Sequence, residues 1–258
     1  MQAVEDSTWR FRDNAYHRII MSVDLGKRQD HTAWAITETK RELRKNKRQQ
    51  NTAIIISTVR DIQRLPLDTD YDVVAQRIHS TFWDDRLWLR HDQSGVLIAP
   101  TLLVDAGGVG DAVCDDLHKD LGMPFVRYRL VRGTAAENRH GRFDYTVPRT
   151  QMFQQLYAAF HSERIRIDRR LENAKVLLKE LKGLQVERNE ETGYVKVVHR
   201  ENEHDDLAIA LAAANWWANR PLKRGTRAYY ADGTVVDSVH GVIRRGNDPT
   251  LSKLMGYS

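Results

Sequence analysis

The 258-residue sequence is poor in the features that mark several classes of protein. Its single cysteine, Cys114, cannot form an internal disulfide, and we expect a buried thiol that packs rather than reacts. No apolar run is long enough to span a membrane, and the polar, acidic residues 1–13 do not resemble a signal peptide. These absences argue against a disulfide scaffold and favour a cytoplasmic protein.

The surplus of positive charge is small, because 40 Lys and Arg stand against 35 Asp and Glu. It favours a polyanionic partner only weakly, and the placement of the basic residues is more informative. Six fall in residues 40–50, which we expect to form the exposed tip of a β-hairpin: Lys40, Arg41, Arg44, Lys45, Lys47 and Arg48. A second predicted hairpin, residues 185–199, carries or adjoins Arg188, Lys196 and Arg200. Either group could contact a DNA backbone or simply be solvated.

The hydrophobic pattern predicts one α/β domain at residues 18–218, after a lead-in at 1–17 and before a C-terminal tail at 219–258. Three antiparallel strands are expected first, followed by a strand–helix–strand unit with a parallel pair at residues 101–131. This order matches a ribonuclease-H-like mixed sheet with helices on both faces, plus an inserted β-hairpin. The remaining expected elements are strands at 18–24, 32–39, 51–59 and 164–167, and helices at 71–89, 147–160, 171–181 and 204–217.

Carboxylates stand where predicted strands end or a predicted helix begins. Asp24 and Asp105 each end an apolar run, and the pair Asp205 and Asp206 opens the last helix. Acids gathered at one sheet edge cannot all stay ionised without cations, and hard divalent ions are the usual solution. Taken singly, each acid could belong to an ordinary turn or helix cap. Together they predict a two-metal site, with Asp24 as the bridging ligand and Asp30 acting from farther out.

These motifs resemble the nuclease domain of the large terminase subunit of tailed bacteriophages. The resemblance rests mainly on Val23–Gly26 with Asp30–Ala33, on Val104–Gly110 and on His204–Leu211, and it runs from about residue 18 to 218. It implies a metal-dependent endonuclease that cuts concatemeric viral DNA during genome packaging. It also implies two Mg²⁺ or Mn²⁺ ions held by Asp24, Asp105 and Asp205, or by Asp206 in place of Asp205. Double-stranded DNA would be the substrate, and a packaging ATPase, a small terminase subunit or a portal would be possible partners.

One departure from that family is the lack of a Gly-x-x-x-x-Gly-Lys-Ser/Thr phosphate loop, so we do not expect this chain to translocate DNA. Three alternatives stay open. The segment Leu207–Ala210 also looks like the corresponding helix of Holliday-junction resolvases. An actin-like or sugar-kinase-like ATP-binding protein would use Asp24–Gly26 and Asp105–Gly108 around phosphates. A catalytically inactive DNA-binding module is the third.

Overall fold

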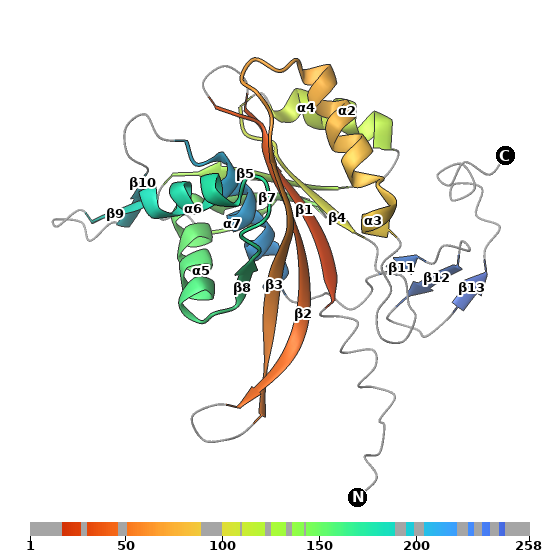
Figure 1. The fold of residues 1–258 in the computed structure, drawn as a ribbon. Helices are drawn as coiled ribbons and strands as arrows, with labels where there is room; N and C mark the ends of the chain where they lie inside the picture. The colour runs from red at the N-terminus through yellow and green to blue at the C-terminus, as the bar shows by residue number, and fades with distance from the viewer. Residues whose placement is uncertain are drawn as a thin grey trace, which may run out of the picture.

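A single mixed sheet of eight strands forms the centre of the molecule (Figure 1). The computed structural model describes residues 17–26, 30–45, 51–88, 100–108, 110–121, 125–132, 136–141, 143–188, 195–198, 204–220, 227–229, 234–237 and 243–245. The strands of the sheet are β1 (Arg18–Asp24), β2 (Ala33–Lys45), β3 (Asn51–Arg64), β4 (Thr101–Asp105), β5 (Val126–Val131), β6 (Asn138–Arg139), β7 (Asp144–Pro148) and β8 (Ile165–Ile167).

The strand order is β6-β7-β5-β4-β1-β2-β3-β8. Strands β1, β2 and β3 form an antiparallel meander, whereas β4 pairs parallel with β1 and β5 pairs parallel with β4. This is the mixed arrangement that the sequence predicts, and the ribonuclease-H-like α/β fold is confirmed. The carboxyl ends of β1 and β4 therefore meet at one edge of the sheet.

Helices cover both faces of the sheet (Figure 1). One face carries α2 (Tyr71–Phe82), α3 (Asp85–Trp88) and α4 (Gly110–Leu121), and the other carries α5 (Arg149–His161), α6 (Ala174–Gly183) and α7 (Asp206–Ala218). Successive residues of β1 enter different cores: Ile20 packs with the α5–α7 side and Met21 with the α2–α4 side. Because β1 is buried on both faces, its sequence between Arg18 and Asp24 is apolar except for Ser22.

Helix α7 is buried all around, since it packs against β1, β2, β3, α5 and α6. Such a helix is apolar on every side, which explains its run of Ala, Leu, Ile and Trp. The Arg18 guanidinium donates to the carbonyl oxygens of Trp217 at 2.8 Å and Arg220 at 2.6 Å. These bonds satisfy acceptors at the end of α7 and fix its axis against β1. The end of α7 is thereby held against β1.

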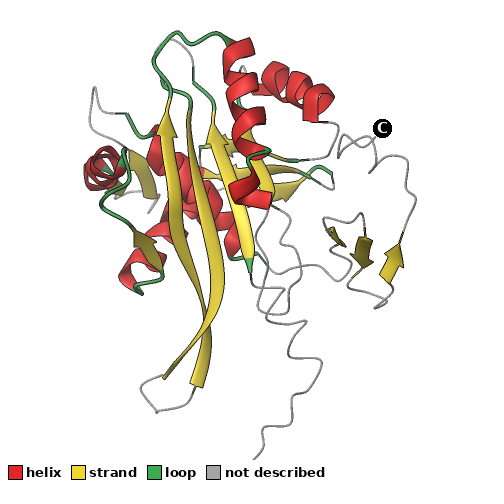
Figure 2. Cartoon of the chain, turned by 45° about the vertical axis from the view of Figure 1, so that its right-hand side comes forward, coloured by secondary structure: helices red, strands yellow, loops and turns green. Residues whose placement is uncertain are grey.

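Several expectations need correction. Residues 40–45 continue strand β2 instead of forming a hairpin tip, and β3 runs on to Arg64. The long β2–β3 pair extends beyond the rest of the sheet as an arm (Figure 2). The helix expected at 71–89 is divided into α2 and α3 by residues 83–84.

The remaining strands lie outside the central sheet, and one pair of them confirms the predicted hairpin. The expected hairpin is present as β9 (Gln185–Arg188) and β10 (Val195–Val198), paired antiparallel. The tail contains three short paired strands that the sequence pattern did not predict: β11 (Arg227–Tyr229), β12 (Thr234–Asp237) and β13 (Ile243–Arg245). Cys114 is buried in the α2–α4 core, as expected. Among the described residues, no helix has the length and apolar character needed to cross a membrane.

Candidate metal centre

Asp24 and Asp105 lie next to one another at the carboxyl ends of neighbouring parallel strands. The register pairs Val23 of β1 with Val104 of β4, so the following residue of each strand is the acid. The Asp24 residue is only 8% exposed. Beneath them, the Tyr128 hydroxyl of β5 donates to the Val23 carbonyl at 3.1 Å and fixes the end of β1. The sheet therefore delivers two carboxylates to one point.

The glycines that follow each acid are required by close backbone approach. A Cβ on Gly26 would lie 2.2 Å from the carbonyl oxygen of Asp30, and a Cβ on Gly110 would lie 2.3 Å from that of Asp105. Any side chain at either position would force the turn open. The Gly107 N–H also donates to Asp105 Oδ1 at 2.8 Å, which orients this carboxylate. Gly26, Gly107 and Gly110 thus shape the turns that hold the acids.

Helix α7 brings in the other two acids, which face opposite sides. Asp205, the residue before α7, forms an ion pair with Arg149 at the start of α5. Asp206, the first residue of α7, accepts from Arg64 at 3.0 Å and from the backbone N–H of His31 at 3.3 Å, both through Oδ2. Because Arg149 follows β7 and Arg64 ends β3, Asp205 faces the β4–β5 side and Asp206 the β2–β3 side.

The other three carboxylates act electrostatically on Asp24. Burial, and then the negative charges of Asp105, Asp206 and Asp205, raise the pKa of Asp24 well above its usual range, against a lowering by Arg149. Burial raises the pKa of Asp105 to about 6, although its bond from Gly107 opposes the shift. Burial also raises the pKa of Asp206, opposed by Arg64. The site therefore holds more negative charge than its arginines neutralise.

This surplus fits a divalent cation. Among the described residues, none donates a hydrogen bond to the carboxylate of Asp24, although its neighbours Asp105, Asp205 and Asp206 each have a donor. Buried carboxylates are normally paired or bound to a metal. Carboxylate oxygens are also the ligands that Mg²⁺ and Mn²⁺ prefer. The donor set of Asp24 and Asp105 is thus suited to such an ion.

The sequence did not assign three residues to the site that the structure places there: Arg64, Arg149 and Glu180. Glu180 of α6 is 6% exposed, accepts the Ala208 N–H at 2.9 Å and lies 3.6 Å from Arg64. Burial raises its pKa to about 7. The spacing of the buried residues Ala174, Leu177 and Glu180 places this acid on the apolar face of α6, and that anomaly is visible in the sequence.

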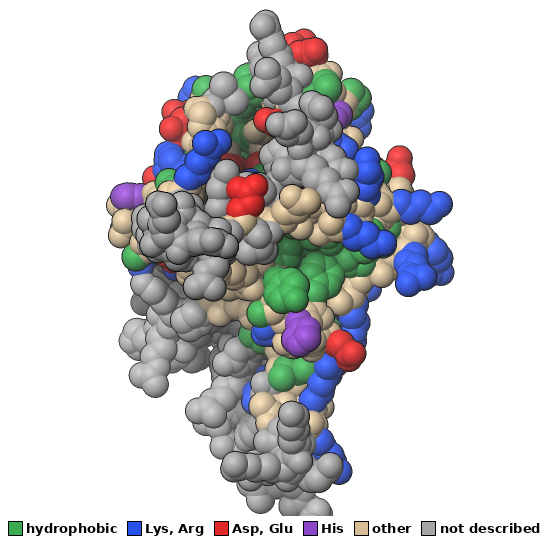
Figure 3. Space-filling view, turned by 90° about the vertical axis from the view of Figure 1, so that its left-hand side faces the viewer, with side chains coloured by type: hydrophobic (Ala, Val, Ile, Leu, Met, Phe, Trp, Pro, Cys, Tyr) green, Lys and Arg blue, Asp and Glu red, His purple; other side chains and the backbone are tan. Residues whose placement is uncertain are grey.

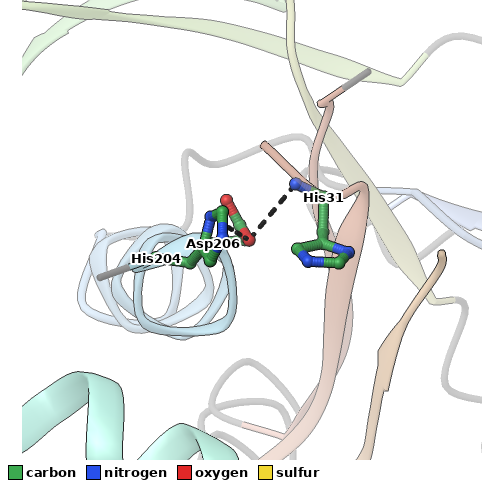
Figure 4. Close-up of side chains that lie close together, drawn as sticks. All are labelled: His31, His204 and Asp206. Atoms are coloured by element: carbon green, nitrogen blue, oxygen red, sulfur yellow. Dashed lines mark hydrogen bonds and ion pairs between the residues drawn. The ribbon is translucent and has the colours of Figure 1, made fainter. Parts of the chain in front are cut away.

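Two histidines also belong to this region. His31, His204 and Asp206 each offer a ligand atom, and these atoms lie within 4.8 Å of one another (Figure 4). Within the described ranges this is the one group of three metal-ligating side chains gathered so closely, and it contains one of the four predicted acids. Asp30 is 75% exposed and lies 3.9 Å from His204 Nδ1. The structure therefore places Asp30 beside the histidines.

The predicted DNA-binding residues of β2 lie away from the acids. Lys40, Arg41, Arg44 and Lys45 occupy the distal half of β2. At about 3.3 Å per residue, Lys45 is about 40 Å from the site end of this strand. Arg188 and Lys196 lie in the separate β9–β10 hairpin, while Lys47, Arg48 and Arg200 lie outside the described residues. The basic residues of β2 and the four acids thus occupy opposite ends of the sheet.

No protein-family model and no curated protein sequence matches this chain. Solved structures with a similar course of the backbone include terminase nuclease domains. The magnesium-bound domain from the thermophilic phage G20c is 15% identical, with a TM-score of 0.47, and the match covers 78% of this chain and 81% of that one. The manganese-bound domain from bacteriophage SPP1 is 9% identical, with a TM-score of 0.41 and coverage of 83% and 92%. The manganese-soaked domain from human cytomegalovirus is 13% identical, with a TM-score of 0.45 and coverage of 83% and 90%.

Proposed function

We propose that this protein is a metal-dependent endonuclease that hydrolyses phosphodiester bonds in DNA. The observation that supports it most directly is geometric: Asp24 and Asp105 end neighbouring parallel strands, and the acids at the start of α7 lie close enough to raise the pKa of Asp24. These acids come from three elements that are far apart in the sequence. Burial of so many carboxylates disfavours folding unless cations compensate it, which is typical of a functional site.

In this proposal Asp24, Asp105 and Asp205 hold the divalent ions, with Mg²⁺ or Mn²⁺ as the metals. Asp24 is central because the other three acids all raise its pKa. Asp205 is the third ligand because it faces the β4–β5 side, where Asp105 lies. Ions held there would activate the attacking water and stabilise the departing oxygen, leaving a 5′-phosphate and a 3′-hydroxyl.

The surrounding residues keep this arrangement rigid. Arg149 holds Asp205, and Arg64 holds Asp206 while also lying near Glu180. Glu180 in turn accepts the backbone N–H of Ala208 in the first turn of α7. These contacts fix both acids at the start of α7 relative to the strand ends, and such preorganisation is what two-metal chemistry requires.

The finer proposal is that the substrate is double-stranded viral DNA cut during genome packaging. It rests on the terminase-like motifs around Asp24, Asp105 and His204. A packaging ATPase, a small terminase subunit or a portal would then act together with this chain. Contacts with DNA should be made mainly to phosphates, so that binding is salt-sensitive and weakly sequence-selective. A kinase-like ATP-binding fold is less favoured, because one continuous sheet replaces the two comparable domains that such proteins need.

The test is cleavage of supercoiled plasmid by the full chain with Mg²⁺, Mn²⁺ or EDTA. We expect nicking and linearisation with either metal and none with EDTA. A four-way DNA junction in the same assay addresses the resolvase alternative, which predicts strong preference for the junction over the plasmid. ATP hydrolysis without DNA cleavage would reject the nuclease in favour of the kinase-like alternative.

A further inference from the structure

The β2–β3 side of the acid cluster carries a second set of possible ligands. His31 lies in the segment ahead of β2, and His204 and Asp206 lie at the start of α7 (Figure 4). We propose that His31, His204 and Asp206 form a transition-metal site of the Zn²⁺ class, distinct from the carboxylate site of Asp24, Asp105 and Asp205. This inference concerns metal binding and does not depend on the proposed cleavage of DNA.

The hydrogen bonds of His31 leave one ring nitrogen ready to bind a metal. Its Nδ1 lies 2.7 Å from the carbonyl oxygen of Leu65, which can only accept a hydrogen bond. The proton of the neutral ring therefore sits on Nδ1, and Nε2 keeps its lone pair. A backbone carbonyl that orients a histidine in this way is the usual support of a metal ligand.

His204, two residues before α7, faces the same point. Its ring centroid is 5.0 Å from that of His31, with an edge-on angle of 75° between the rings. Its Nδ1 lies 4.0 Å from Asp206 Oδ2, which is too long for a direct hydrogen bond. Donors that each lie about 2.1 Å from a tetrahedral ion are about 3.4 Å apart, so a small inward rotation of the histidines would complete the site.

Asp206 is held in place for this role. Arg64 and the His31 backbone N–H both donate to Oδ2, which leaves Oδ1 for another partner. The Asp206 residue is 2% exposed, whereas the side chain of His204 is 36% exposed. A buried, fixed carboxylate with two more accessible imidazoles gives an ion a path from solvent to its ligands.

The donor set selects the class of metal. Two imidazole nitrogens and one carboxylate oxygen suit Zn²⁺, Co²⁺ and Mn²⁺, whereas Mg²⁺ prefers an all-oxygen site such as that of Asp24 and Asp105. Three protein ligands also leave positions open for water or a phosphate oxygen. The chain thus offers two neighbouring positions of different metal preference.

The test is titration of the full chain with Co²⁺, followed by its visible absorption, with Zn²⁺ affinity measured by calorimetry. His31→Gln and His204→Gln should each weaken binding by about 10–100-fold and reduce the Co²⁺ absorption. The exposed His118 of α4 provides the matched control, and His118→Gln should bind as the wild type does. If His31→Gln and His204→Gln both bind Co²⁺ like the wild type, the assignment is wrong.

Two further measurements distinguish loss of metal binding from loss of DNA cleavage and from failure to fold. Asp24→Asn should abolish DNA cleavage and leave the Co²⁺ spectrum of the histidine site intact, so loss of one function does not imply loss of the other. If a histidine variant fails to fold, the ring signals of the wild-type protein are followed by NMR instead. One equivalent of Co²⁺ should perturb His31 and His204 selectively, and an equal effect on His118 would overturn the proposal.

Discussion

At the site end of β1, β2 and β3, acids are buried beside one another, whereas on the arm the acid Glu42 is paired with an arginine. Asp24 has its pKa raised by burial and by three other acids. On the arm, both oxygens of Glu42 accept from Arg166 at 2.8 Å. Between the two ends, the bonds from His17, Lys40 and Arg60 lower the pKa of Glu38, so that this acid stays ionised. Among the described acids of these strands, Glu38 and Glu42 thus have basic partners, whereas no described residue donates a hydrogen bond to Asp24.

The difference separates two roles for charge in this molecule. Surface ion pairs such as Glu42–Arg166 contribute little to stability. Lys and Arg side chains gather along one edge of the face that α5 and α6 cover (Figure 3). Unbalanced buried charge, in contrast, reduces stability and persists where a ligand compensates it. Because of this contrast, we assign the metal ions to the acids and any contacts with DNA phosphates to the basic surface.

The largest effect is expected from the acids themselves. Asp24→Asn and Asp105→Asn should each lower metal-dependent cleavage by about 10³-fold or more, because a metal ligand is removed. Asp24→Asn should at the same time raise the free energy of unfolding in EDTA by about 1 kcal/mol, since a buried charge is removed. Plasmid cleavage and thermal melts measure the two effects. Asp168→Asn, at an exposed acid paired with Arg170, is the control and should leave cleavage unchanged.

The next effect concerns the support of α7. Glu180→Ala removes the acceptor for the Ala208 N–H and the partner of Arg64, and should lower the free energy of unfolding by about 1–3 kcal/mol. Because the start of α7 then loosens, cleavage should fall by about 10–100-fold. Glu180→Gln keeps an acceptor oxygen and should recover much of the stability. The exposed Glu172 of the preceding turn is the matched control, and equal losses in Glu172→Ala would contradict a specific role for Glu180.

A third prediction uses the pH dependence of the metal-free protein. The folded-state pKa values of Asp24, Asp105 and Glu180 are raised, to about 6 for Asp105 and about 7 for Glu180. Between about pH 4 and 7 the folded state therefore binds more protons than the unfolded state, and stability falls as pH rises through this window. In EDTA the melting temperature should be higher at pH 5 than at pH 8. Excess Mn²⁺ should reverse the order, and a metal-free melting temperature that rises over this range would contradict the assigned shifts.

The sequence alone predicts where the buried strands end, but it does not predict which residues pair with the acids. The ends of β1 and β4 were predicted because strands buried on both faces are continuous apolar runs that stop at a polar residue. The same apolar runs gave the order of strands and helices, and this order indicated the fold. The extent of β2 was missed, because its distal half is exposed and lacks apolar alternation.

The partners of the acids could not be predicted from local pattern. Arg64 is 142 positions from Asp206, and Arg149 is 56 positions from Asp205, so only the folded chain brings them together. His31 was visible within the Asp30–Ala33 motif, but its closeness to His204 depends on how α7 meets the sheet. The metal-ligand roles of Asp24, Asp105 and Asp205 remain predictions.

The smallest effect is expected at the arm. Arg44→Gln with Lys45→Gln should weaken DNA binding by a few fold and reduce the slope of log affinity against log salt by about 1 for each phosphate that is no longer neutralised. Turnover at saturating DNA should be unchanged, because these residues are about 40 Å from the acids. Lys119→Gln on α4, at a residue paired with Asp116, is the control. A large loss of turnover in the arm variant would mean that the two ends act together.

The most direct test of the central claim is anomalous scattering from crystals soaked in Mn²⁺. The account predicts anomalous peaks within bonding distance of the carboxylates of Asp24 and Asp105, with Asp205 turned toward them. Peaks confined to other surfaces, with Asp24 left without a metal at saturating Mn²⁺, would contradict it.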